Sequence, residues 1–141
     1  MIVPLDPMHF ELLSLQPSQS GAELTCAKAL ALLAAGKAMT CLNAKGRVVA
    51  CAGLMLLWEG RGMAWANFGA VVRSNMTEVV RAMAHEIDES PFHRVEMYIA
   101  HPRRRQDTRL AELLGFRFEC TAKWFLPDKS DVDVFVWTRH N

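Results

Sequence analysis

Alternating apolar and polar residues predict a strand at residues 94–100, because successive side chains of a strand point to opposite faces of a sheet. Pro102 interrupts this pattern, and after Arg104 the apolar residues recur three and four positions apart, as on one side of a helix. Gly115 ends the predicted helix, and alternation resumes over residues 116–121. This stretch therefore predicts a strand, a short helix and a second strand.

Three more helices are predicted from caps, apolar spacing and helix propensity. The first starts at the Asp6–Pro7 cap and ends before Pro17. The second covers residues 22–35 and follows the Ser20–Glu23 capping box. The third runs from Met76 to Ser90–Pro91. Ser74 or Asn75 is the predicted cap of the last helix, which places Glu78 in its first turn.

Five further strands are predicted from apolar runs between residues typical of turns. They cover residues 2–5, 37–42, 47–58, 63–72 and 132–136, with turns at 43–46, 59–62 and 127–130. The short turn at 43–46 favours antiparallel pairing of the strands on either side of it. The order of elements predicts a mixed sheet with helices.

Composition fits one domain over residues 1–141. With 51% hydrophobic and 22% charged residues the chain is not expected to be disordered, and a net charge of +1 gives no overall attraction to nucleic acid or membranes. The longest uncharged apolar run, residues 48–58, is too short to span a bilayer, and the N-terminus lacks the features of a signal peptide. We expect a soluble protein that is intracellular when made.

Cysteines and histidines give no metal-binding pattern. Cys26, Cys41, Cys51 and Cys120 are scattered without a C-x-x-C pair, so they are predicted to be reduced residues on buried faces. His85–Glu86 lacks the second histidine that a zinc protease needs. We therefore predict no metal.

Leu114, Gly115 and Phe116 close a short helix and lead into a final pair of alternating runs. In these residues the chain resembles the C-terminal half of GNAT-type acetyltransferases, whose last helix commonly ends in leucine, glycine and phenylalanine. The resemblance implies an α/β (α+β) fold with a central mixed, mostly antiparallel sheet of about six to seven strands, flanked by about four helices.

Over its whole length, including the opening residues 1–24, the chain also resembles the small GNAT-like proteins of short-tailed (podoviral) phages, the group that includes internal virion protein A. This resemblance implies a non-catalytic protein that acts through protein contacts in virion assembly or as a virion component. Its expected partners are portal, tail or internal virion proteins, and its expected location is the host cytoplasm during infection or the particle. The oligomeric state stays open.

The stretch that would hold a cofactor departs from the GNAT pattern. The family's loop after the fourth strand binds the pyrophosphate of acetyl-CoA with a motif like Q/R-x-x-G-x-G/A, whereas residues 73–78 contain no glycine and match only at Arg73. Glu78 would compete with an anion there. The family's tyrosine acid corresponds to Ala111, its helix asparagine to Arg104, and residues 63–72 contain no glutamate. No cofactor is therefore expected.

The alternative is an acetyl-CoA-dependent N-acetyltransferase with relocated catalytic groups. Glu96 and Tyr98 lie roughly 6.6 Å apart along one face of a strand, so both could reach one substrate atom and transfer protons. Their other interpretation is a half-exposed strand face covered by a helix. The backbone groups that would bind acetyl-CoA belong to Val71, Asn75, Met76 and Thr77.

A basic run at Arg103, Arg104 and Arg105 is either solvated surface or a partner-binding patch, since arginines near a helix start favour an anionic neighbour. No aromatic residues interleave the arginines, so nucleic acid is the least favoured partner. The tryptophans at 58, 65, 124 and 137 are all predicted on strands and are expected in the core, unless one is exposed as an anchor for another protein.

Overall fold

One seven-stranded sheet runs through the computed structural model, which describes residues 1–13, 24–69, 73–103 and 105–139. The strands are β1 (Ile2–Pro4), β2 (Gly36–Leu42), β3 (Val48–Trp58), β4 (Arg61–Phe68), β5 (Arg94–Ala100), β6 (Arg117–Ala122) and β7 (Val132–Thr138). They lie in the order β1-β2-β3-β4-β5-β7-β6, with β4 and β5 parallel and the other neighbours antiparallel. The mixed, mostly antiparallel sheet confirms the predicted fold class.

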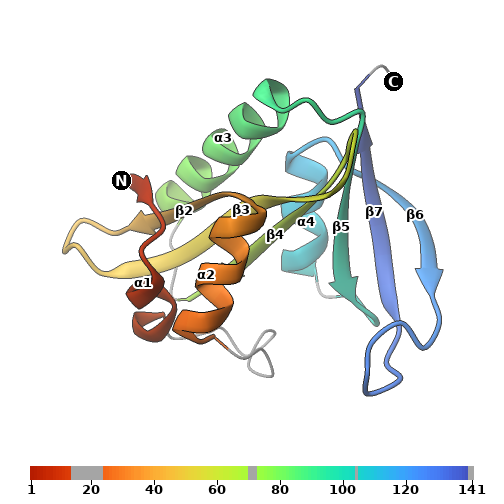
Figure 1. Cartoon of the computed structure of the whole chain (residues 1–141), viewed down its shortest axis with the longest axis horizontal. Helices are drawn as coiled ribbons and strands as arrows, with labels where there is room; N and C mark the ends of the chain where they lie inside the picture. The colour runs from red at the N-terminus through yellow and green to blue at the C-terminus, as the bar shows by residue number, and fades with distance from the viewer. Residues whose placement is uncertain (14–23, 70–72, 104, 140–141) are drawn as a thin grey trace.

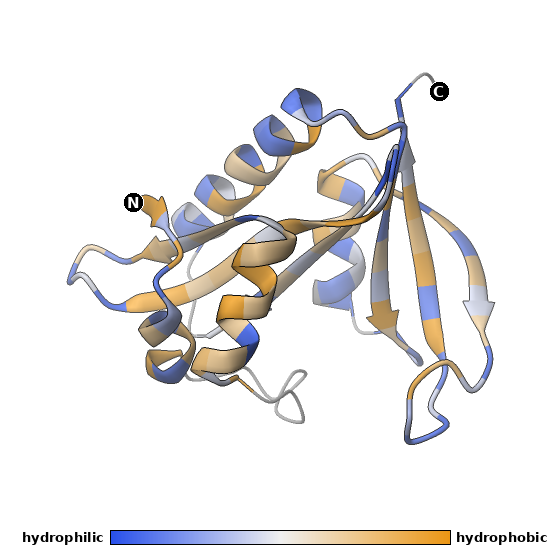
Figure 2. Ribbon diagram, viewed as in Figure 1, coloured by the Kyte–Doolittle hydropathy of each residue, from blue (hydrophilic) through white to orange (hydrophobic). Residues whose placement is uncertain are grey.

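Four helices are described, and they cover both faces of the sheet (Figure 1). They are α1 (Pro7–Leu12), α2 (Cys26–Ala35), α3 (Arg73–Glu89) and α4 (Arg105–Leu113). The helices α1 and α2 share a small apolar cluster with one face, built around Phe10, Ala29 and Cys51. On the other face, α3 and α4 pack on the main core, which includes Met83 and Val95. In Figure 2, α2 is mostly apolar, whereas α3 carries both polar and apolar positions.

Local sequence signals explain most helix boundaries. Asp6 caps α1 as predicted, since its side chain accepts a hydrogen bond from the Met8 amide, and His9 completes a capping box. The prediction for α2 was wrong at its start, because Thr25 is the cap and the helix begins at Cys26. The proposed Ser20–Glu23 box and Pro17 lie outside the described residues. Gly115, with a φ of 85°, follows α4 as predicted.

The start of α3 differs from the prediction. The helix begins at Arg73, so Ser74 and Asn75 lie in its first turn and are not its caps. Glu78 therefore lies in the second turn, and its carboxylate contacts the amino group of Met1 at 2.7 Å. The expected competition between Glu78 and an anion at the helix start is thus removed.

The edge strand β6 contains an irregularity that the alternating pattern does not reveal. Phe118 pairs with Phe135 but Cys120 pairs with Val134, so a bulge at Glu119 reverses the faces of the residues that follow. Cys120 is exposed, like the preceding residues of this edge strand, and the prediction that it is buried was wrong. The same bulge places Thr121 opposite Asp133 on β7.

Candidate functional site

The two halves of the sheet meet at β4 and β5 and then part. Only three residue pairs join the strands, from Arg61 with Arg94 to Met63 with Glu96. Beyond this junction β4 continues to Phe68 and β5 to Ala100, and Figure 1 shows them diverging. We call this divergence the β4–β5 fork. Ligands of open α/β sheets bind at the carboxyl ends of neighbouring parallel strands, which makes the fork the candidate site.

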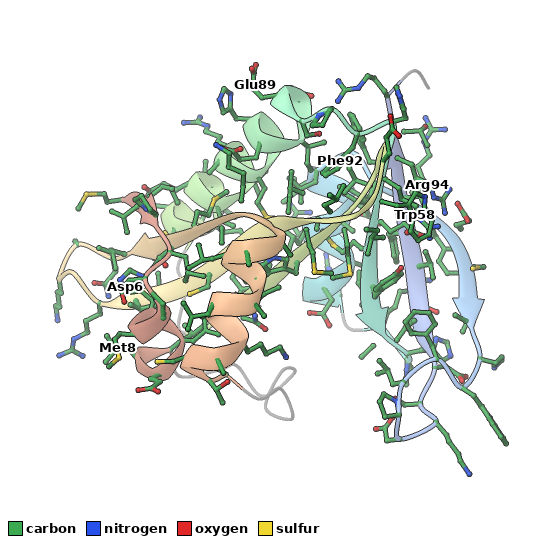
Figure 3. All side chains as sticks on the ribbon, viewed as in Figure 1. Asp6, Met8, Trp58, Glu89, Phe92 and Arg94 are labelled. Carbon is green, nitrogen blue, oxygen red and sulfur yellow. The ribbon has the colours of Figure 1, made fainter. Side chains whose placement is uncertain are left out.

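A buried carboxylate lies at the closed end of the fork. Glu96 is 3% exposed, and it is held by the guanidinium group of Arg61 through hydrogen bonds of 2.5 and 2.6 Å. Arg94 donates to Glu96 at 3.3 Å and to Glu119 on β6 at 2.9 and 3.0 Å. Arg61 also lies 4.1 Å from the ring centre of Trp58. Figure 3 shows Trp58 and Arg94 at this end of the sheet.

These contacts use the hydrogen-bonding capacity of Glu96. Its two oxygens accept two bonds from Arg61, one from Arg94 and one from Tyr98. A carboxylate offers about four lone-pair sites, so none is left for a substrate proton. The arrangement favours Glu96 as a residue that joins the two half-sheets and positions Tyr98, rather than as a base that contacts substrate.

Tyr98 lies two residues beyond the last β4–β5 pair, at the fork itself. Its hydroxyl donates a long bond of 3.4 Å to Glu96, and its ring packs 5.0 Å from that of Phe125. Burial raises the pKa of the Tyr98 phenol, and the nearby charge of Glu96 raises it further. The phenol is therefore protonated at neutral pH and can act as a proton donor.

The residues predicted to bind the cofactor lie in the first turns of α3. Asn75 is buried, Met76 is half-buried, and the exposed Thr77 hydroxyl donates to the Arg73 carbonyl oxygen at 3.1 Å. The first turn contains no acidic residue, so the positive end of the α3 dipole faces no carboxylate of its own first turn. Val71, the remaining predicted residue, lies outside the described residues.

The basic run is only partly a surface patch. Arg103 contacts the buried carboxylate of Asp133 at 3.2 Å and lies over the ring of Phe118 at 4.6 Å. Arg105 is exposed at the start of α4, and Arg104 lies outside the described residues. Arg103 and Arg105 therefore do not form one uniform surface.

Asp133 connects β7 to the segment that follows β5. His101 Nδ1 lies 3.0 Å from its carboxylate, and the Thr121 hydroxyl donates to it at 2.6 Å. Burial pushes the pKa of Asp133 upward, but the hydrogen bonds from Thr121 and His101 and the charge of Arg103 outweigh burial and lower the pKa. Asp133 is thus an ionised, buried anchor.

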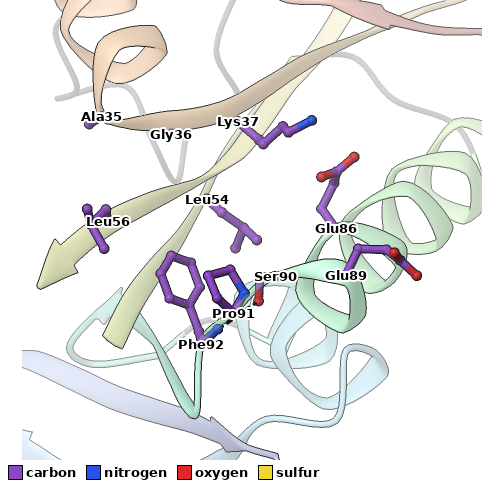
Figure 4. Close-up of a pocket in the computed structure, with 10 residues that line it drawn as sticks. All are labelled: Ala35, Gly36, Lys37, Leu54, Leu56, Glu86, Glu89, Ser90, Pro91 and Phe92. Atoms are coloured by element: carbon purple, nitrogen blue, oxygen red, sulfur yellow. Dashed lines mark hydrogen bonds between the residues drawn. The ribbon is translucent and has the colours of Figure 1, made fainter. Parts of the chain in front are cut away.

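A separate apolar hollow of about 240 Å³ lies at the other end of α3 (Figure 4). Leu54, Leu56 and Phe92 form its apolar part, and Glu86 and Glu89 contribute carboxylates. These carboxylates belong to the last turns of α3, about 20 Å (Glu86) and about 24 Å (Glu89) along the helix axis from Arg73. This hollow is therefore distinct from the fork.

Solved structures with a similar fold include proteins described as acetyltransferases. Ard1 from Thermoplasma volcanium aligns with a TM-score of 0.77 at 13% identity, covering 100% of this chain and 98% of that one. A ribosomal-protein-S5-alanine acetyltransferase from Vibrio fischeri gives 0.71 at 12% identity, with 99% and 93% coverage. A probable acetyltransferase of the GNAT family from Chromobacterium violaceum gives 0.69 at 17% identity, with 97% and 86% coverage.

This chain has the GNAT fold. The alignments cover nearly the whole chain with TM-scores well above 0.5. No protein-family model matches the sequence, and no curated protein matches it. The identities are low, so the similarity establishes the fold alone.

The position at which the resemblance to GNAT enzymes predicts a tyrosine general acid is fully buried in this chain. Ala111 on α4 is 0% exposed and packs in the main core. A phenol at this position would need space that the core does not offer. Tyr98, which comes from β5, is thus the tyrosine that the fold places at the fork.

Sequence reasoning missed Arg61 and Asp133. Arg61 was assigned to a turn at 59–62, whereas that turn ends at Gly60 and β4 begins at Arg61. The position of Glu96 on a strand with apolar neighbours could have predicted a basic partner, because buried glutamates are almost always paired. Asp133 shares a predicted strand face with Phe135, and the same argument would have required partners for it.

Within the described residues, no helix is long and apolar enough to cross a membrane. No group of three histidine, cysteine, aspartate or glutamate side chains in the same residues is arranged to hold a metal ion.

Proposed function

We propose that this protein is an acetyl-CoA-dependent N-acetyltransferase whose acetyl donor binds in the β4–β5 fork. The main support for this proposal is that the parallel strands β4 and β5 of this GNAT fold diverge after the Met63–Glu96 pair. Each strand is followed by a helix, α3 or α4, that starts from the same edge of the sheet. This arrangement favours an elongated anionic ligand that enters between the strands.

The residues at the fork fit such a ligand. Arg73 and the backbone of Asn75, Met76 and Thr77 form the first turns of α3, where helix N-termini bind phosphate groups. Because Glu78 pairs with the Met1 amino group and lies beyond the first turn, it does not oppose an anion there. These residues would hold the diphosphate of acetyl-CoA.

Tyr98 is the candidate general acid. Bound acetyl-CoA would supply the acetyl group to a primary amine: an N–C bond forms, the C–S bond breaks, and coenzyme A leaves as a thiolate. The Tyr98 hydroxyl can donate a proton to that sulfur and recover one from solvent, while the proton lost by the amine passes to water. Glu96 acts as a positioning residue, since its contacts fix the Tyr98 hydroxyl.

Thermal unfolding with acetyl-CoA tests the proposal. A ligand at 100 times its Kd adds about 2.7 kcal/mol to the free energy of unfolding. ATP at the same concentration is the control, because it lacks the arm that would enter the fork. Transfer is then followed by release of the coenzyme A thiol in the presence of polyamines or peptides with a free N-terminus. An unfolding temperature that millimolar acetyl-CoA leaves unchanged would contradict the proposal.

A second candidate function is that of a non-catalytic podoviral GNAT-like protein of the internal virion protein A type. The observation that favours it is an exposed apolar tip between β6 and β7: Trp124 is 72% exposed, Phe125 47% and Leu126 38%. Trp124 was predicted on a strand but lies in this loop, with a φ of 54°. Exposed aromatic residues are good anchors for protein partners.

In this second candidate, the protein acts in the host cytoplasm during infection or in the particle, through portal, tail or internal virion proteins. Its test is co-purification with assembled particles. Trp124→Ser should reduce the amount of particle-bound protein, whereas the exposed turn variant Lys45→Ser should not. A wild-type protein that is missing from purified particles and binds none of these partners would exclude the role.

A further inference from the structure

Two apolar surfaces lie near opposite ends of β5: the apolar hollow at the end of α3, and the apolar tip between β6 and β7 (Figure 1). Phe92, which lines the hollow, comes two residues before β5. The tip comes just before β7, whose first residue, Val132, pairs with Ala100 at the end of β5. Seven residues of β5 span about 20 Å. The tip and the hollow of one molecule therefore do not contact each other.

The apolar hollow is small. Its volume of about 240 Å³ is below the roughly 300–1,000 Å³ of pockets that enclose small ligands, so it suits a single side chain of a partner. Leu54 and Phe92 in its wall are buried, whereas Leu56 is 55% exposed (Figure 4). An exposed leucine beside such a hollow is a surface that an aromatic side chain can cover.

The negative charge of the hollow is not explained by α3 itself. Glu86 and Glu89 lie at the negative end of the helix dipole and three residues apart, so they repel both the dipole and each other. Neither forms an ion pair with any residue in the described ranges. The nearby guanidinium of Arg139 donates instead to backbone carbonyl oxygens, among them that of Ser90 at 2.7 Å. Two carboxylates against the one amino group of Lys37 make the hollow suitable for a cation beside an apolar group.

The apolar tip offers this combination. Trp124 is 72% exposed, and its backbone is fixed because its amide donates to the Asp131 carboxylate at 2.9 Å. Asp128 and Asp131 accept hydrogen bonds from within the loop, Asp131 also from Lys123. The Lys129 ammonium lies 5.4 Å from the centre of the Trp124 ring and forms no ion pair within the described residues. The tip therefore presents a preorganised aromatic ring next to an unpaired positive charge.

We propose that the apolar tip of one copy of this chain inserts into the apolar hollow of a second copy. Trp124 covers the leucine and phenylalanine side chains of the hollow, and Lys129 approaches its two glutamates. Because the two surfaces are different, the contact is heterologous, and repeating it builds rings or open chains of copies. The contact does not involve acetyl-CoA, so this inference is independent of the proposed function.

Sedimentation equilibrium of the full chain, up to about 1 mM protein, tests the contact. The wild type should self-associate, and added salt should weaken the association because part of the attraction is between charges. Trp124→Ser on the tip and Leu56→Lys at the hollow should each weaken it at least about thirtyfold, the loss typical of a central interface residue. Leu113→Lys is the matched control: this leucine of α4 is 49% exposed and belongs to neither surface, so its substitution should change nothing.

Mixing the two variants gives the decisive result. Trp124→Ser keeps an intact hollow and Leu56→Lys keeps an intact tip, so the mixture should form a one-to-one dimer that grows no further, although neither variant associates alone. A dimer in the mixture also shows that both variants are folded. The inference is overturned if the wild type stays monomeric, if the variants associate as the wild type does, or if the mixture stays monomeric. If the chain alone is monomeric but needs Trp124 to bind a virion protein, the tip is a contact for another protein and the inference is likewise wrong.

Discussion

At the scale of single residues, Glu96 illustrates how a tertiary contact defines a side chain's role. Both Glu96 and Tyr98 were predicted to share one strand face, and the structure does bring their polar atoms together at 3.4 Å. What the sequence did not show is that Arg61 and Arg94 already bind the Glu96 carboxylate. The two side chains are therefore not equivalent, because the acceptor sites of Glu96 are already used and the Tyr98 hydroxyl makes a single long hydrogen bond to it.

Glu96→Gln should destabilise the protein by about 1–3 kcal/mol, because the amide removes the buried charge that the half-buried guanidinium groups of Arg61 and Arg94 bind. Urea unfolding measures this change. Glu119→Gln is the control: Glu119 is about half exposed, and surface ion pairs contribute about 1 kcal/mol or less. Equal effects of the two substitutions would show that burial of Glu96 has no special importance.

Tyr98→Phe separates folding from catalysis. The hydroxyl makes one long hydrogen bond, so its loss should change the free energy of unfolding by less than about 1 kcal/mol. If Tyr98 is the acid, kcat should fall by about 10²-fold or more while the Kd of acetyl-CoA stays the same. Because the Tyr98 pKa is raised above its ordinary value of 10.0, the wild-type rate should not decline from Tyr98 ionisation below that pH. A variant with full activity would remove Tyr98 from the mechanism.

At the scale of secondary-structure elements, the turns and helix ends were the most predictable features. Gly115 ends α4 in the left-handed conformation, and the turn at 43–46 joins an antiparallel pair as expected. Element boundaries were less predictable at α3, where Ser74 and Asn75 resemble caps but are helical. Cap residues are also compatible with a first helical turn, so composition alone does not locate the boundary.

Gly115→Ala should cost about 1–2 kcal/mol, since an L-residue with a Cβ is disfavoured at a φ of 85°. The new methyl group would meet Trp137 only at an ordinary 3.8 Å, so the cost is conformational and not steric. Gly115→Asn is the matched variant and should cost less, because asparagine tolerates this conformation better. Chemical denaturation of both variants checks the order, and an equal cost would point to packing instead.

At the scale of the whole molecule, the two half-sheets are joined by few contacts relative to their size. Three residue pairs connect β4 to β5, and the Glu96 ion pairs bridge the same junction. Asp133 performs a similar task at the opposite end of β5, where it holds β6, β7 and the segment before α4. Buried carboxylates thus hold β5 in place at both of its ends: Glu96 joins it to β4, and Asp133 joins the segment after it to β6 and β7.

Acid should weaken the molecule through Asp133. Its pKa in the folded state is below the ordinary value of 3.8, so ionised Asp133 stabilises the fold above that pH, and this contribution is lost as pH falls through the lower folded pKa. Unfolding free energies measured from pH 6 to pH 2 should therefore decline below about pH 4 in the wild type. Asp133→Asn should lower stability at pH 6 by about 1–3 kcal/mol and decline less on acidification.

Glu119→Gln is again the control for the acid titration, because the hydrogen bond from Arg94 lowers the pKa of Glu119 at an exposed site. The Glu119→Gln substitution should flatten the pH dependence of the free energy of unfolding much less than Asp133→Asn does. Parallel pH profiles for the wild type and Asp133→Asn would contradict the role of Asp133.

The sequence by itself determined the order of strands and helices, the hairpin turns and the resemblance to GNAT proteins, because periodicity, turn residues and caps act between residues a few positions apart. Only the tertiary structure decided which side chains meet. The start of β4 gave Glu96 its partner Arg61, the bulge in β6 turned Thr121 towards Asp133, and the parting of β4 and β5 placed Tyr98 at a fork. These contacts depend on strand register and on neighbours distant in sequence, which a local pattern of apolar and polar residues does not encode.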